Sequence, residues 1–261
     1  MPTVFELIKE EFISELDAIR VLVTTHDELG KPPKVRVAAA NSATLLVAAT
    51  FEEYIRQSAR EYARLVVSNA RSFADVPKKL AATAWRRSLE RLAKVSFDVE
   101  DQPTRNARLV MAGSTFSAVH EFVRGDLTRD IFGDLIHNEN NMRPNELNSM
   151  FKVSGLGDVC ARLCEMQPIK DHFQEAESGK AHGKLIAALE EFMERRNSIA
   201  HALNPGSSTG ADQILKDLDM LGALAASLFQ VLDKQVPVSQ LPRDVELGAV
   251  VPKVGPDANP P

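Results

Sequence analysis

Residues 45–55 read LLVAATFEEYI. The first half of this stretch is apolar nearly all round, which indicates a helix that lies in the core of the protein. Asn41 and Ser42 stand just before it, and such side chains cap helix N-termini, so we expect this helix from about residue 43 to about residue 70. Residues 36–40 give a weak indication of a short extended piece.

Helical periodicity continues on both sides of this segment, and nothing in the pattern favours a sheet. The composition agrees, because Ala and Leu are abundant while aromatic residues make up 6% of the chain. We therefore predict an all-α bundle with short connections. The further helices are expected at residues 3–24, 77–95, 107–123, 126–136, 145–151, 156–165, 168–174, 185–203 and 211–234, with loops at 96–104, 137–144 and 175–183.

The chain of 261 residues divides into three expected parts. A helix within residues 1–30 should pack on a bundle formed by residues 31–235. Residues 236–261 contain six Pro and two Gly, so we expect a disordered tail. The N-terminus has acidic residues where a signal peptide needs an apolar core, and no apolar run reaches the roughly 18 residues that span a bilayer. We expect a cytoplasmic protein without a membrane partner.

Charge is unevenly distributed along the chain. Residues 51–95 contain ten Lys or Arg and five Asp or Glu, a local charge of +5 in a protein whose net charge is −5. Within this segment Arg56, Arg60 and Arg64 recur every four residues and share one helix face. They could bind an RNA backbone, and the alternative is a solvated face whose arginines pair with acids on the same helix.

A second polar motif, RRNSIAH, ends the helix expected at residues 185–203 and spans Arg195 to His201. It combines a permanent cation with an imidazole, the side chain that exchanges protons near neutral pH, and these two groups can cleave RNA without a metal. The alternative is a helix C-terminus whose cations favour the helix dipole. No cofactor or metal is expected, because the two cysteines, Cys160 and Cys164, cannot complete a zinc site and resemble small buried hydrophobic residues.

Three segments together resemble the HEPN superfamily, and more closely its RiboL-PSP-HEPN branch. They are residues 45–55, residues 141–151 with the Gly155-Leu156-Gly157 that follows, and the motif at residues 195–201. The resemblance covers roughly residues 40–235. Residues 138–141, an Asn-rich loop before the second segment, could contact RNA bases or supply only turn chemistry.

The resemblance implies a HEPN-like bundle of four to five core helices with additional short helices. It also implies a metal-independent endoribonuclease that acts as a homodimer, with one signature motif from each protomer facing the other. Many such proteins belong to toxin–antitoxin or antiphage systems, so an antitoxin or defence-system partner is expected. Arg196 matches the signature arginine, Asn197 the polar position and His201 the histidine, while Arg195 could replace Arg196 in a looser form of the motif.

The expected reaction is attack of the ribose 2′-OH on the adjacent phosphate, which yields a 2′,3′-cyclic phosphate and a 5′-OH. We assign His201 as general base or acid and Arg196 as phosphate clamp. Asn197 lies four residues before His201 and can orient its ring. Arg196 lies about 140° away around the helix, so it must either curl around the helix or reach the histidine of a partner chain.

Three further residues receive lesser roles. Arg195 is a second candidate for phosphate contact, and Glu52 and Glu53 either support the site or only pair with a nearby cation. A different function stays open, in which the bundle is a non-catalytic adaptor that binds RNA or a protein.

Overall fold

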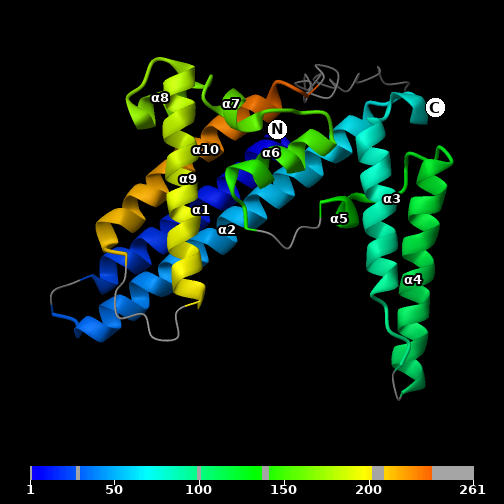
Figure 1. Ribbon diagram of the computed structural model, residues 1–261, viewed down its shortest axis with the longest axis horizontal. Coiled ribbons are helices and arrows are strands. Elements are labelled where there is room, and N and C mark those ends of the chain that lie inside the picture. Colours follow the sequence, from blue (N-terminus) through cyan, green and yellow to red (C-terminus); the bar gives the residue numbers. More distant parts are fainter. Residues whose placement is uncertain (1, 28–29, 99–100, 137–140, 202–208, 237–261) are drawn as a thin grey trace, which may run out of the picture.

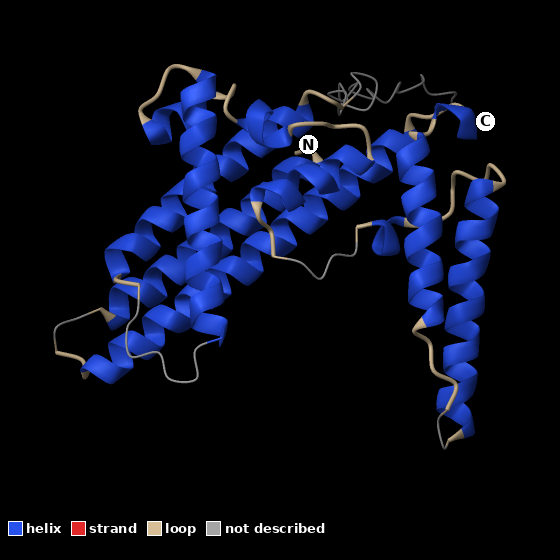
Figure 2. Cartoon of the chain, in the orientation of Figure 1, coloured by secondary structure: helices blue, strands red, loops and turns tan. Residues whose placement is uncertain are grey.

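The structure is a computed structural model that describes residues 2–27, 30–98, 101–136, 141–201 and 209–236. Every element in these residues is a helix, which confirms the predicted all-α fold (Figure 2). The elements are α1 (Val4–His26), α2 (Pro33–Ser68), the 3-10 helix η1 (Phe73–Asp75), α3 (Lys78–Ala93), α4 (Gln102–Val123), α5 (Phe132–Leu135), α6 (Pro144–Val153), α7 (Val159–Leu163), α8 (Gln167–Phe173), α9 (Ser178–His201) and α10 (Ala211–Asp233).

The main bundle forms where α1, α2 and α10 run side by side and α9 crosses them (Figure 1). Phe51 and Ile55 of α2 are fully buried in its core. Of the apolar residues 45–49 that were predicted to lie in the core, Val47 and Ala48 are fully buried, whereas Leu45 and Leu46 are exposed, so that prediction is correct for one face of the helix and wrong for the other. The Phe12 ring of α1 stacks on Tyr54 of α2 with ring centroids 4.2 Å apart. Tyr54 also donates a hydrogen bond of 3.2 Å to the backbone oxygen of Ala225 in α10, so one side chain joins all three helices.

Helix α2 begins ten residues earlier than its predicted start, which was wrong. Pro33 occupies the first helical position, where the missing N–H of proline costs nothing, and residues 38–40 are alanines with the highest helix propensity. Asn41 is therefore not a cap but a buried residue inside the helix, 7% exposed. Residues 36–40 are helical and form no extended piece.

Other boundaries also differ from the predictions. Helix α9 starts at Ser178 rather than residue 185, because buried Ala181 already belongs to its core-facing stripe. Helix α4 starts at Gln102, where the Asp101 side chain accepts a 2.8 Å hydrogen bond from the backbone N–H of Thr104 as an N-cap. Most of the helix predicted at residues 126–136 is a turn region, and only α5 is helical there.

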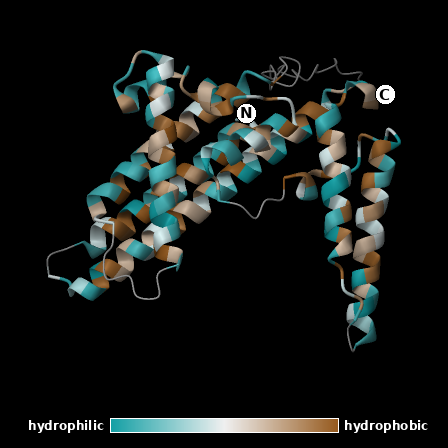
Figure 3. Ribbon diagram, in the orientation of Figure 1, coloured by the Kyte–Doolittle hydropathy of each residue, from teal (hydrophilic) through white to brown (hydrophobic). Residues whose placement is uncertain are grey.

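Helices α3 and α4 form a hairpin that stands beside the bundle (Figure 1). The C-terminal half of α3 is attached to α5, where Asp134 accepts hydrogen bonds from Arg91 at 2.6 Å and from Ser88 at 3.1 Å. Hydrophobic residues occur over much of the length of α4 (Figure 3). Several of its large apolar side chains are exposed, for example Val110 at 73%. Packing of α3 against α4 therefore buries few apolar side chains within the hairpin.

Cys160 and Cys164 are both fully buried and unpaired with each other, as the sequence analysis expected of small buried residues. Burial raises the pKa of Cys160 to about 12 and that of Cys164 to about 11. Neither thiol is therefore activated as a nucleophile. None of the helices in the described residues is long and apolar enough to cross a membrane.

Candidate functional site

The motif at residues 195–201 forms the last two turns of α9. One side of α9 is buried in the core through Leu185, Leu189, Phe192 and Met193. After these anchors the helix leaves the core, so Arg196 and Asn197 are half-buried and His201, its last residue, is exposed. The motif thus stands at an open helix end.

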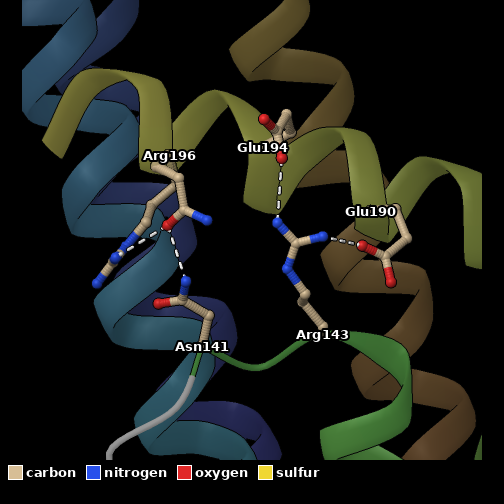
Figure 4. Close-up of polar contacts among 6 residues, drawn as sticks. Asn141, Arg143, Glu190, Glu194 and Arg196 are labelled. Carbon is tan, nitrogen blue, oxygen red and sulfur yellow. Dashed lines mark hydrogen bonds and ion pairs between the residues drawn. The ribbon is translucent and has the colours of Figure 1, made fainter. Parts of the chain in front are cut away.

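Asn197 is the junction of this motif. Its Oδ1 accepts a hydrogen bond of 2.8 Å from the Asn141 side-chain amide and one of 3.2 Å from the Arg196 guanidinium (Figure 4). A guanidinium can only donate, so the Asn197 atom that faces Arg196 must be the oxygen. This fixes the orientation of the Asn197 amide and requires Asn141 to present its NH2 group.

Asn141 is held in place by the two residues that follow it. Met142 is fully buried. Arg143 forms ion pairs with Glu190 and, at 3.0 Å, with Glu194, both on α9 (Figure 4). These two carboxylates raise the pKa of Arg143, so the guanidinium is held in its charged form. The segment before α6 is therefore fastened to α9 one turn before the motif.

Asn141 was predicted as part of an Asn-rich loop and as the first residue of the segment 141–151, without a role in the site. Residues 138–140 of that loop lie outside the described residues. The structure places Asn141 against α9, which no local sequence signal indicates. Asn141 lies two residues before Arg143, which pairs with two acidic residues of α9. That pairing explains why Asn141 lies against α9, but it is known only from the fold.

His201 is separated from the other two motif residues. It forms no hydrogen bond with Asn197 or Arg196 within the described residues, and the Asn197 oxygen is used by Asn141 and Arg196 instead. The predicted orientation of His201 by Asn197 is therefore not seen in this single chain. The residues that follow His201, 202–208, lie outside the described part.

Arg195 points to a different neighbour from Arg196. Its guanidinium donates to the Asp217 carboxylate of α10 at 2.7 Å, and Gln213 donates to the same oxygen at 3.0 Å. Burial raises the pKa of Asp217, and the hydrogen bonds and the Arg195 charge oppose that rise. Arg195 thus joins α9 to α10, whereas the prediction offered it for phosphate contact.

The three arginines predicted to share one face of α2 have unequal surroundings. Arg56 pairs with Glu52 at 3.1 Å, and Arg64 pairs with Glu61 at 2.6 Å. Arg64 also reaches Asp130. Arg60 forms no ion pair with any described residue, and its Nε is buried without a hydrogen-bond partner. Two of the three charges are therefore already compensated within the protein.

The two acidic residues predicted to support the site, Glu52 and Glu53, also differ in their surroundings. Glu52 is 8% exposed, and one of its oxygens accepts from Arg56 while the other is buried without a partner. Glu53 lines a hollow of about 330 Å³ formed by residues of α1 and α2, and no residue of α9 lines it. In the described part of the chain, no three His, Cys, Asp or Glu side chains are grouped so that they could hold a metal ion.

A protein-family model described as RiboL-PSP-HEPN matches residues 10–234, which include most of α1 and all the other described helices. The chain belongs to this family. The predicted resemblance to the RiboL-PSP-HEPN branch is thereby confirmed. No curated protein and no solved structure matches the chain.

Membership of a HEPN branch points to a ribonuclease with an RNA substrate. In this RiboL-PSP-HEPN protein, Arg196 and His201, the two residues predicted to match the family signature, lie at the C-terminal end of α9. The arrangement offers a cation with a fixed neighbour and a separate proton-exchanging group, which are the components of acid–base RNA cleavage.

Proposed function

We propose that this protein is a HEPN-type endoribonuclease that cleaves single-stranded RNA through attack of the ribose 2′-OH and without a metal. The observation that supports this most strongly is the Asn141–Asn197–Arg196 network at the open end of α9. A surface arginine normally samples many rotamers, and a hydrogen-bonded neighbour reduces that freedom. A cation held in this way can stabilise the charge that develops on a phosphate in the transition state.

The roles follow from the chemistry of the side chains. His201 removes the 2′-OH proton or protonates the 5′-oxygen leaving group, and Arg196 binds the phosphate. Asn197 holds Arg196 through its Oδ1. The products are a 2′,3′-cyclic phosphate and a 5′-OH, and DNA, which has no 2′-OH, is resistant.

The working form is a homodimer with a composite site. Arg196 and His201 are five residues apart on one helix, so they lie about 140° apart around its axis. A two-fold axis near the end of α9 brings the arginine of one protomer towards the histidine of its partner. Such an arrangement explains why His201 has no hydrogen-bond partner among the described residues of its own motif.

The family resemblance further supports a role as a toxin or an antiphage effector, controlled by an antitoxin or another component of a defence system. On α2, Arg60 is the member of the arginine row that can still contact an RNA phosphate, since Arg56 and Arg64 are paired with acids. Glu52 serves as the partner of Arg56 and not as a group of the site.

The test is cleavage of a labelled single-stranded RNA by the purified protein in excess EDTA. We expect cleavage with cyclic phosphate ends, no cleavage of the matching DNA, and loss of activity in His201→Ala with the dimer intact. Equal cleavage by His201→Ala would rule out the mechanism. Tight RNA binding without cleavage would favour the non-catalytic adaptor.

A further inference from the structure

A polar hollow of about 670 Å³ lies where α6 meets the start of α3 and the loop before α7. Three cations line it, namely Lys79 of α3, Lys152 of α6 and Arg162 of α7. Its single acidic residue is Asp158. We call this feature the α6 hollow, and its lining carries a net charge of about +2 at neutral pH.

The positive charge of the α6 hollow is available to a ligand. Lys79 and Lys152 are exposed, and neither forms an ion pair with any described residue. Arg162 uses one of its donors in a 3.0 Å hydrogen bond from Nε to the backbone oxygen of Gly157, which leaves the terminal nitrogens free of such a bond and holds the side chain at the rim. On α2, in contrast, Arg56 already has an acidic partner.

The other lining groups suit phosphate oxygens better than a base. Asn145, Asn148 and Ser149 add amide and hydroxyl groups. The Oδ1 of Asn148 accepts a 2.9 Å hydrogen bond from the backbone N–H of Cys160, so its NH2 group remains as a donor. Among the described residues that line the hollow there is no aromatic ring on which a base could stack. The lining therefore favours the phosphodiester backbone.

The α6 hollow is linked to the motif by one rigid element. Asn145, Asn148, Ser149 and Lys152 recur at the spacing of a single helix face. The same helix begins directly after Arg143, which is ion-paired to α9 beside the motif. A ten-residue helix is about 15 Å long, so α6 places the hollow within a few nucleotides of Arg196.

We propose that the α6 hollow binds phosphates of the RNA substrate on one side of the cleavage site. The identity of the ligand rests on the proposed ribonuclease function, whereas the binding can be measured without any cleavage. Lys79 and Lys152 each neutralise a phosphate, and Arg162 completes the cradle. The α6 hollow, and not the row of arginines on α2, is then the main contact with the RNA backbone.

The experiment measures binding of a fluorescent single-stranded RNA at several salt concentrations, with all proteins carrying His201→Ala so that the RNA stays intact. Adding Lys79→Gln and Lys152→Gln should make the plot of log affinity against log salt shallower by about 1.4, because each lost contact with a single strand contributes about 0.7. The matched control is Lys31→Gln with Lys34→Gln, which removes two exposed charges, one just before α2 and one in its first turn.

The controls separate a lost contact from a lost fold. Cys160 lies beneath the hollow, so it should remain unreactive to a thiol reagent in the Lys79→Gln, Lys152→Gln protein if the structure is intact. An unchanged slope, or an equal fall in the Lys31 and Lys34 control, overturns the proposal. So does release of the RNA by inorganic phosphate at constant ionic strength, which would assign the hollow to a free phosphate.

The two proposals fail in different ways. If the protein binds RNA through the hollow but His201→Ala does not alter cleavage, the α6 hollow stands and the mechanism falls. If cleavage requires His201 and the slope does not depend on Lys79 and Lys152, the mechanism stands and the hollow is overturned.

Discussion

The Nδ2 atom of Asn141 lies 2.8 Å from the Oδ1 atom of Asn197, although 56 positions separate the two residues in the sequence. This contact brings the segment before α6 to the motif at the end of α9. Because Asn197 Oδ1 also accepts from Arg196, the position of the guanidinium depends on a residue outside the motif. Asn141 is therefore a positioning residue in the proposed site.

Asn141→Ala should lower the rate of RNA cleavage about fivefold, which corresponds to the ~1 kcal/mol of one hydrogen bond. The reason is that Asn197 would lose its fixed orientation and Arg196 its fixed neighbour. The loss should fall on kcat rather than KM, since other contacts hold the RNA. Single-turnover and steady-state cleavage assays measure both constants.

Two variants test whether Asn141→Ala lowers kcat because Arg196 is no longer held in position. Asn197→Asp should keep most of the activity, because a carboxylate oxygen accepts from both Asn141 and Arg196. Asn106→Ala removes an exposed asparagine of α4 that bonds only to Gln102 on its own helix, and it should behave as wild type. Wild-type kcat in Asn141→Ala would show that the contact has no role in positioning Arg196.

Mixing two inactive proteins tests the composite site. Arg196→Ala and His201→Ala should each be inactive, yet a heterodimer of the two contains one site with an intact arginine and an intact histidine. Random exchange makes half of the dimers heterodimers, so about a quarter of the wild-type activity should return. The assay is RNA cleavage after subunit exchange, with unmixed samples as controls. No return of activity would place both residues in a site within one protomer.

Arg195→Met should reduce stability rather than catalysis. It leaves the Asp217 carboxylate buried without a cation, which should lower the free energy of unfolding by about 1–3 kcal/mol at neutral pH. The pKa of Asp217 is already raised by burial, so its protonation favours the folded state. As pH falls through that raised pKa, the carboxylate becomes neutral and the penalty of the substitution should shrink.

Chemical denaturation at about pH 7 and about pH 5 measures this pH dependence. The double variant Arg195→Met, Asp217→Asn removes both charges and should recover most of the lost stability at neutral pH. A loss of cleavage in Arg195→Met without a loss of stability would instead return Arg195 to the RNA-binding surface.

Most helices could be predicted from the sequence because their apolar residues recur with the helical period. The buried stripe of α10 is an example. The starts of α2 and α9 were harder to predict from the sequence. Asn41 resembles a cap in isolation, but the alanines before it favour helix and tertiary packing buries it. Ser178 begins α9 although two glycines follow closely, because Ala181 is buried in the core.

Local chemistry alone was enough to indicate a helical protein with an Arg-Asn-x-x-x-His motif at a helix end, since periodicity and side-chain type are properties of neighbouring residues. The hydrogen-bond and ion-pair partners of those side chains could not be predicted from the sequence. Arg195 and Arg196 are adjacent and chemically identical, yet one pairs with Asp217 on α10 and the other with Asn197. Helix packing directs each side chain to its surroundings, and contacts between distant segments leave no periodic signal in the chain.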